Sequence, residues 1–193
     1  SDRSVGATAA GLIVKLYGRE GLPKSKRIKV RFDGEAGQSF GAWCVQSLDL
    51  ELRGFAQDGI AKGMSGGTVV VCLPQQNNSV STEIQSLAGN NVGYGATGGT
   101  ILISGRAGHR LGIRNSGATI VAEAAGKYAC EYQTRGRVII LGPIENEIGS
   151  GMTGGELFVY DPACCRHYQR RNVCAMQLPA VANSKNILPI RKL

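Results

Sequence analysis

The stretch GIAKGMSGGTVVV, residues 59–71, places four glycines within nine residues and then runs into a β-branched, apolar segment. The same arrangement returns in VGYGATGGTILI, residues 92–103, and in IGSGMTGGELFV, residues 148–159. Glycine loops that bind phosphate are followed by a helix whose N-terminus meets the anion. Each of these stretches leads instead into residues that favour a β-strand. The repetition therefore predicts tight corners between strands rather than three nucleotide sites.

The spacing of the glycines gives the size of the repeat. Two intervals of 19 residues separate Gly117, Gly136 and Gly155, and the interval from Gly67 to Gly99 is 32 residues, which is one repeat plus the 13-residue polar insertion PQQNNSVSTEIQS. A β-rich repeat of this length suits one coil of a parallel β-helix. About seven coils, stacked at the usual strand spacing, make a rod roughly 30 Å long.

Short apolar segments separated by glycine turns predict the strands, and we therefore expect an all-β fold, a single-stranded parallel β-helix (a solenoid). The expected strands lie at 28–32, 48–52, 68–71, 100–103, 118–122, 137–141 and 156–160.

The ends of the chain differ from the repeats. Apolar residues at helical spacing predict a helix over residues 2–17, capped by Asp2 or Ser4 and ended by Gly18. We therefore divide the chain into a helix and linker (1–25), the β-helix (26–161) and an irregular cap or docking tail (162–193).

Two corner glycines, Gly66 and Gly98, are expected to adopt positive φ. Valine at either position should then destabilise the corner and expose an apolar strand.

Composition and charge limit the classes of partner. The chain has 193 residues, of which 42% are hydrophobic and 19% charged, and its net charge of +8 is concentrated near the two ends. A basic surface for a polyanion stays open as an alternative, but no interleaving of basic and aromatic residues points to nucleic acid. No segment reaches the roughly 18 apolar residues of a membrane span, and no cleavage site follows the first apolar segment. We expect a cytoplasmic protein without nucleic-acid or membrane partners.

Six cysteines occur without any C-x-x-C pair. Cys72 and Cys130 lie among apolar residues and are expected to be buried. A metal site is not expected, because His167 is the one histidine near the remaining C-terminal cysteines and a second ligand pair is missing. The other cysteines are Cys44, Cys164, Cys165 and Cys174.

No arrangement of residues typical of catalysis emerges, and we expect no catalytic, cofactor-binding or metal-binding residues in this chain. His109 is expected to be a surface or hydrogen-bonded polar residue. Trp43 is expected to pack inside, with a partner-facing position as the alternative.

Several polar side chains beside the glycine turns are expected to have structural roles. One group is expected to bond carbonyls at corners or to contact a partner: Arg106, Arg110 and Arg114. A second group is expected to tolerate left-handed backbone or to form Asx turns: Asp58, Asn90, Asn91 and Asn115.

Six segments, in order over about residues 2 to 161, resemble one family. They are SDRSVGATAAGLIVKLYGREGLP, GQSFGAW, GIAKGMSGGTVVV, NNVGYGATGGTILISGRAGHRLGIRNSGATIVAEA, CEYQTRGRVIILG and GSGMTGGELFVYD. Together they resemble the C-terminal GXGXG domain of the glutamate synthase large subunit. The tail CRHYQRRNVCAMQLP is similar to the segment that follows the β-helix in that family. The sequence departs from the family at His109, where an acidic residue is frequent.

The resemblance implies a right-handed parallel β-helix within the enzyme that makes two L-glutamate from L-glutamine, 2-oxoglutarate and a reductant. It implies a non-catalytic domain or stand-alone subunit in a hetero-oligomer, packed between the amidotransferase and FMN-binding parts. The glutaminase cysteine, FMN and the iron–sulfur cluster belong to those partners, so no catalytic residue carries over. Related β-helices, one of them a scaffold subunit of formylmethanofuran dehydrogenase and another a part of N-methylglutamate synthase, remain alternatives.

Overall fold

The computed structural model describes residues 2–23, 25–73, 85–160 and 173–176. The chain begins with helix α1 (Ala7–Tyr17) and a single 3₁₀ turn, η1 (Gly18–Glu20). Nine strands follow within the described residues: β1 (Ile28–Ala36), β2 (Leu48–Ala56), β3 (Ser65–Cys72), β4 (Ser86–Ala88), β5 (Gly98–Ala107), β6 (Ser116–Ala125), β7 (Arg135–Ile140), β8 (Glu156–Tyr160) and β9 (Val173–Met176). None of the helices in these ranges is long and apolar enough to cross a membrane.

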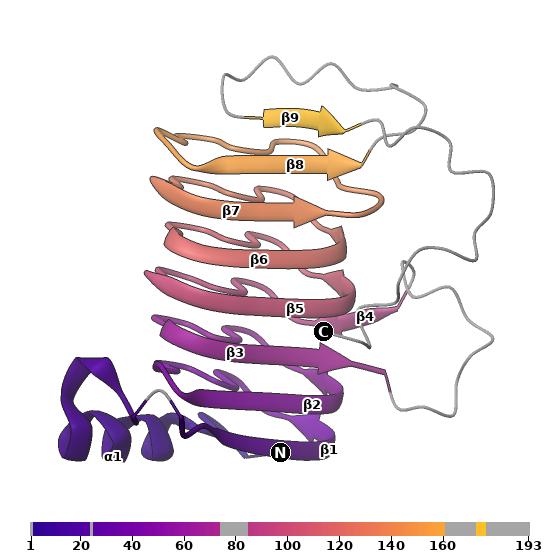
Figure 1. Ribbon diagram of the computed structural model, residues 1–193. Helices are drawn as coiled ribbons and strands as arrows, with labels where there is room; N and C mark the ends of the chain where they lie inside the picture. The colour runs from indigo at the N-terminus through magenta and orange to yellow at the C-terminus, as the bar shows by residue number, and fades with distance from the viewer. Residues whose placement is uncertain (1, 24, 74–84, 161–172, 177–193) are drawn as a thin grey trace.

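All strand pairs are parallel, and the strands stack in the order β1-β2-β3-β5-β6-β7-β8-β9, with β4 paired to β2 and β5. In Figure 1 the strands in front run from left to right while the chain rises from β1 to β9, which makes the coil right-handed. The expected parallel β-helix is confirmed. It makes about 6 turns, where the sequence indicated about seven.

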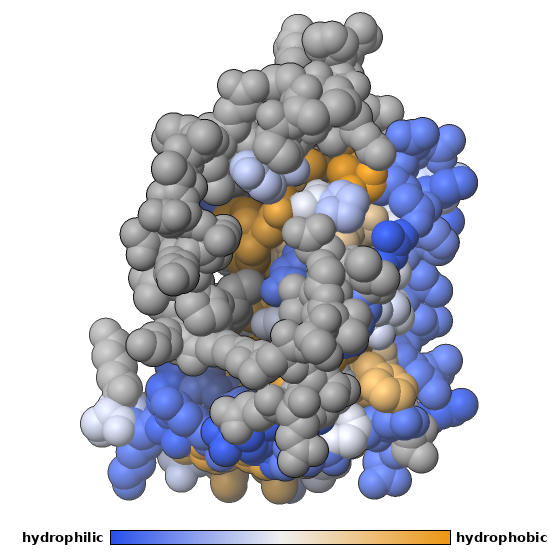
Figure 2. All heavy atoms as spheres, turned by 90° about the vertical axis from the view of Figure 1, so that its right-hand side faces the viewer, coloured by the Kyte–Doolittle hydropathy of each residue, from blue (hydrophilic) through white to orange (hydrophobic). Residues whose placement is uncertain are grey.

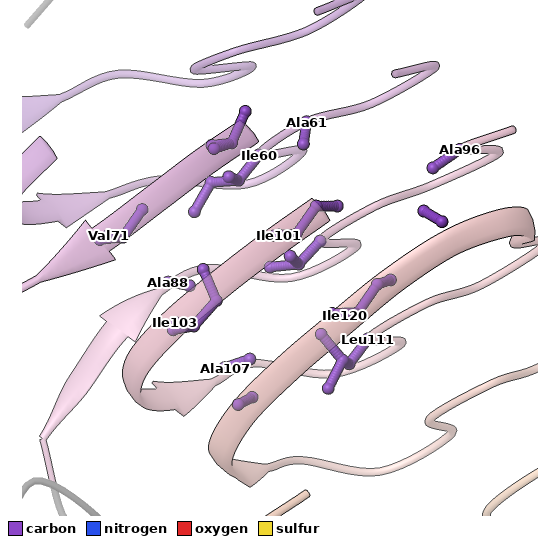
Figure 3. Packing of buried hydrophobic residues seen from close by; sticks show 14 of the residues in the cluster. Ile60, Ala61, Val71, Ala88, Ala96, Ile101, Ile103, Ala107, Leu111 and Ile120 are labelled. Carbon is purple, nitrogen blue, oxygen red and sulfur yellow. The ribbon is translucent and has the colours of Figure 1, made fainter. Parts of the chain in front are cut away.

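The core is a set of apolar columns that run along the rod. Because side chains alternate across a strand, every second residue of each strand points inward, and parallel pairing stacks these residues coil on coil. One column consists of aligned residues that are each at most 2% exposed: Leu50, Val69, Ile101, Ile120, Val138 and Leu157. Figure 3 shows Ile60 and Leu111 from the turn side packed with Ile101 and Ile120 from the strands.

The turns opposite the strands share an unusual backbone in which every second residue has positive φ. Gly59 (φ 76), Ala61 (φ 55) and Gly63 (φ 64) illustrate the pattern. Their N–H groups bond to neighbouring coils in alternation, to Asn90 O, Phe40 O and Tyr94 O, each at 2.8 Å. Glycine adopts positive φ without steric cost, so this alternation explains the recurrence of glycine at every second position.

Not every such position holds glycine. Across the described turns, ten non-glycine residues occupy these alternating positions with positive φ: Ser39, Trp43, Ala61, Asn91, Arg110, Arg114, Tyr128, Cys130, Tyr132 and Glu147. The hydrogen bonds to both neighbouring coils hold this backbone in place even where the side chain disfavours it.

The start of the helix differs from the prediction. Helix α1 begins at Ala7 and not at residue 2, and its N-cap is Gly6, without a side-chain cap from Asp2 or Ser4. The preceding residues bond to the first turn of the β-helix instead, where Ser4 N–H donates to Gln38 O at 2.9 Å. The expected end is confirmed, since Gly18 is the C-cap with φ 67.

All seven predicted strands are present, but one detail of the register is corrected. Thr119 pairs with Arg137 and Arg137 with Glu156, so the intervals between coils are 18 and 19 residues, because the pairing shifts between Ser116 and Thr119. The sequence also missed β4 and β9. Most of the polar insertion and most of the C-terminal tail lie outside the described residues.

The role expected of Gly66 and Gly98 is wrong in one respect. Positive φ belongs to the following residues, Gly67 (φ 78) and Gly99 (φ 88). Gly66 is required for another reason, because a Cβ there would lie 2.7 Å from the backbone N of Gln46. A Cβ on Gly98 would lie 2.7 Å from the carbonyl oxygen of Ser65.

Candidate functional site

A shallow groove lies on the turn side of the β-helix, where side chains from four successive coils meet. Its volume is about 400 Å³, and it is lined by Gln38, Ser39, Asp58, Gly59, Lys62, Asn91, Tyr94, Arg110 and Ile113. The sequence brings these residues together because each occupies an equivalent place in its own turn, and parallel stacking superimposes those places.

A ladder of polar side chains runs beside this groove. The Asp58 Oδ1 accepts the N–H of Asn90 at 2.7 Å, and the Asn90 Oδ1 accepts the N–H of His109 at 2.8 Å. His109 Nδ1 then accepts the N–H of Lys127 at 3.0 Å. Each side chain thus satisfies a backbone donor of the next coil, and the expected hydrogen-bonded role of His109 is confirmed.

Cations lie over aromatic rings along the same turns. The Lys62 ammonium is 5.7 Å from the centre of the Tyr94 ring. Arg110 and Arg114 lie 5.8 and 5.9 Å from the rings of Tyr128 and Tyr132. Contacts of this kind contribute about 0.5–1 kcal/mol at exposed sites.

The arginine side chains contact carboxylates and rings rather than the carbonyls expected for them. Arg106 pairs with Glu145, and Arg110 Nε lies 3.2 Å from Glu131 Oε2. The alternative role of the three arginines, contact with a partner, stays a prediction.

Trp43 is exposed, contrary to the expectation that it packs inside. Its side chain is 54% accessible, and a Cβ on Gly63 would lie 2.9 Å from its Cδ1. The ring therefore lies over Gly63 of the next coil, at the surface of the turns.

Two of the four residues expected to adopt left-handed backbone or to form Asx turns, Asn91 and Asn115, behave as predicted. The expectation is wrong for Asp58 and Asn90, which lack positive φ and accept N–H groups of the next coil instead. Asn91 has φ 59, a left-handed backbone that asparagine tolerates. Asn115 is fully buried, and its Oδ1 accepts the N–H groups of Gly117 at 3.1 Å and Ala118 at 2.9 Å. These bonds form an Asx turn at the start of β6.

The thiols of the described residues are poorly suited to chemistry. Burial raises the pKa of Cys44 to about 12, and burial also raises the pKa of Cys130. Since the thiolate is the reactive and metal-binding form, both thiols stay protonated and inert. Cys72 is only half-buried, which corrects the expectation of full burial. The side chains of the remaining cysteines and of His167 lie outside the described residues.

The described residues also offer no metal centre, since they hold no group of three His, Cys, Asp or Glu side chains that could bind an ion. The titratable groups of the turns serve structure instead. A hydrogen bond to Glu147 raises the pKa of Tyr128, so this phenol stays neutral. What the turn side presents is a row of amphipathic and charged side chains, a composition found at protein interfaces.

The sequence reasoning missed Lys62, Tyr94, Tyr128 and Tyr132 as surface residues. The available signal was their position within the turns, where adjacent buried residues such as Ile60 and Ala61 are flanked by outward ones. Figure 2 views the edge at which the strands end and shows hydrophilic residues along one margin for the height of the stack, with apolar residues nearer its middle.

Comparison with known proteins gives one consistent result. The GXGXG motif family model matches residues 1–193. The NADPH glutamate synthase large chain of Bacillus subtilis is 37% identical over 193 residues, which is all of this chain and 13% of that protein. The NADH glutamate synthase of Schizosaccharomyces pombe is 44% identical over 161 residues, 83% of this chain and 8% of that protein. Ferredoxin-dependent glutamate synthase 2 of Synechocystis is 43% identical over 161 residues, 83% of this chain and 10% of that protein. The chain thus spans about a tenth of the length of these relatives.

Proposed function

Because the chain belongs to the GXGXG family, we propose that it is a structural domain or subunit of glutamate synthase. In this proposal it holds the amidotransferase and FMN-binding parts in position while they convert L-glutamine, 2-oxoglutarate and a reductant into two L-glutamate. The observation that carries the proposal is the match of the whole chain to a segment of a glutamate synthase large chain.

The construction of the turns supports a spacer role. The N–H groups of the turns bond in alternation to the coil above and the coil below, as those of Gly93 to Ile60 O and Gly95 to Ile113 O do. Side chains such as Asn90 add a further bond between coils. A rod tied together at each coil resists bending and keeps the domains at its surface at a fixed separation.

The cofactors of the enzyme are assigned to its other parts. An iron–sulfur cluster needs several cysteine thiolates close together. Among the described residues, the buried cysteines are Cys44 and Cys130, which belong to different coils and have raised pKa values. The described residues therefore do not fit such a cluster.

Co-expression tests the proposal. The chain, carrying a tag, is produced together with the amidotransferase and FMN-binding parts of a glutamate synthase from the same source. We expect the three to elute together in size-exclusion chromatography, and glutamine-dependent glutamate formation to require all of them. A folded chain that elutes alone in the presence of both partners would overturn the proposal.

The alternatives gain no support from the relatives described above, which are glutamate synthases. The same co-expression with the partners of formylmethanofuran dehydrogenase serves as a negative control, and we expect no complex there.

A further inference from the structure

Strand β1 is an open edge at the first coil of the β-helix, at the bottom of the stack in Figure 1. Within the described residues it pairs on one side only, with β2. Its inward side chains are consequently less covered than those of the next coil. Ile28 is 38% exposed, whereas Leu48, its partner in β2, is fully buried.

The backbone of β1 has free hydrogen-bonding positions on its open side. Ile28 donates its N–H to Ser47 O at 2.8 Å, toward β2. In a parallel pair, alternate residues direct both N–H and C=O to the same neighbour. The N–H and C=O groups of Lys29, Arg31 and Asp33 therefore point away from β2, the arrangement by which an edge strand accepts another strand.

The backbone of the N-terminal segment bonds to the turn side of this coil. Gly37 N–H donates to Asp2 O at 3.1 Å, and Gly41 N–H donates to Val5 O at 2.9 Å. Both acceptors face the turn that follows β1. The strand itself stays uncovered by the described residues.

Opposite charges face one another on the outer surface of the first two coils. Lys29 is aligned with Asp49, and Arg31 with Glu51, whose Oε1 lies 3.3 Å from Arg31 Nε. Arg27 Nε also donates to Asp49 Oδ2 at 2.7 Å. A strand added below residues 28–32 of β1 would lie against Lys29 and Arg31 in the same way, so acidic residues are the complement of this part of the edge, which ends before the exposed Asp33 and Glu35.

We propose that β1 accepts an extended segment of a partner domain as an additional strand, in which apolar residues alternate with aspartate or glutamate. The apolar residues of that segment would cover Ile28, Val30 and Phe32, and its carboxylates would face Lys29 and Arg31. The inference rests on the proposed function in taking the segment from another part of the enzyme.

A second copy of the chain is a poor occupant. An antiparallel pair of β1 strands centred on Phe32 would match Lys29 with Glu35 and Arg31 with Asp33, but it would place only Ala36 and Gly34 opposite Ile28 and Val30. The register centred on Val30 would instead place Lys29 of one chain opposite Arg31 of the other. Like charges directly opposite one another destabilise a strand pair. The edge therefore favours a different, acidic chain.

The test uses the full chain and a short synthetic peptide that alternates valine and glutamate. Peptide up to about 1 mM, the range of weak binding, is added while amide hydrogen exchange is followed residue by residue. We expect exchange of the Lys29 and Arg31 amides to slow by about tenfold or more near saturation. A peptide that alternates valine and lysine, and a glutamate peptide N-methylated at alternate residues, should produce no slowing.

Exchanging the charges provides the matched variant. The double substitution Lys29→Glu and Arg31→Glu should abolish binding of the glutamate peptide and create binding of the lysine peptide. Arg137→Glu, which makes the same change on the outer face of an interior strand, should leave glutamate-peptide binding unchanged. No slowing at any peptide concentration, equal binding of both peptides, or dimerisation of the chain through β1 would overturn the inference.

The same double variant separates this inference from the proposed function. If the variant still elutes with the glutamate synthase partners, the edge inference fails and the proposed function stands. If the peptide binds but the unmodified chain elutes without those partners, the proposed function fails.

Discussion

Asn90 and His109 occupy the same place in successive coils, and the side-chain Oδ1 of Asn90 accepts the backbone N–H of His109 at 2.8 Å. His109 repeats this role toward Lys127 through Nδ1. What this position requires is therefore a hydrogen-bond acceptor of suitable length, which aspartate, asparagine and neutral histidine all provide. Histidine at this position therefore meets a requirement that an acidic side chain could also meet.

Replacing His109 tests this requirement. His109→Asn should preserve the free energy of unfolding, because the amide oxygen can accept the N–H of Lys127. His109→Leu should lower it by about 0.5–1.5 kcal/mol, the net value of one hydrogen bond. Chemical denaturation measures both, and Lys127→Ala is the control, since only the backbone of Lys127 takes part. Equal stabilities of the leucine and asparagine variants would contradict the ladder.

Replacing glycine by alanine should change the free energy of unfolding in opposite directions at Gly66 and Gly11. Gly66→Ala should destabilise the chain by about 1–3 kcal/mol, because its Cβ would lie 2.7 Å from the backbone N of Gln46 and the corner must shift. Gly11→Ala, inside α1 with nothing within 4 Å of the new Cβ, should stabilise it by about 0.5–1 kcal/mol. Melting temperatures of the two variants check this. A Gly66→Ala variant that melts at the wild-type temperature would argue against the stacking of these corners.

The strands and the core were predictable from the sequence because inward residues alternate with outward ones in each short segment. The register of the corners was not. Gly66 is needed for close approach alone, whereas Gly67 is needed both for its φ of 78 and because a Cβ there would lie 2.1 Å from Leu48 O. A glycine in the sequence does not show which of these reasons applies. The φ values and the neighbouring backbone atoms of the structure show which task each glycine has.

The surface of the turns was less predictable than the core. Tyr128 and Tyr132 occupy positions with φ of 63 and 54, which neither side chain favours, so local preference gave no signal. The hydrogen bonds between coils impose this backbone. The prediction that Trp43 packs inside was wrong for a related reason. An aromatic residue at such a position projects over the glycine of the next coil and not into the core.

Asn91 offers a direct measure of the cost of the alternating backbone. It has φ 59, so Asn91→Gly should leave the free energy of unfolding within about 0.5 kcal/mol of the wild-type value. Asn91→Val should lower it by about 1–3 kcal/mol, since a β-branched residue is strained in the left-handed region. Denaturation curves of the two variants distinguish these outcomes, and equal stabilities would show that this turn relaxes to another backbone.

The ion pair of Arg27 and Asp49 predicts a dependence of stability on pH. The hydrogen bond from Arg27 lowers the pKa of Asp49, so the folded state favours the carboxylate. The pair therefore stabilises the fold above the unfolded pKa of about 3.9, and this contribution is lost as the pH falls through the lower folded value.

Asp49→Asn should cost about 0.5–1 kcal/mol near neutral pH, since the pair is partly exposed, and the difference from wild type should vanish in strong acid. In an Arg27→Ala background, Asp49→Asn should cost less at neutral pH. If Asp49→Asn lowers the free energy of unfolding equally with and without Arg27, Asp49 acts through other contacts.

The buried thiols give a readout of the whole fold. Because burial raises the pKa of Cys44 to about 12 and also raises that of Cys130, neither forms thiolate at about pH 8, where alkylation of cysteine is usually carried out. Iodoacetamide should therefore leave both unmodified in the folded chain and modify both in denaturant, as peptide mass spectrometry would show. Because Cys44 lies in the first turn and Cys130 in a later one, a loss of protection at Cys44 alone would show that the first coil opens independently of the rest of the rod.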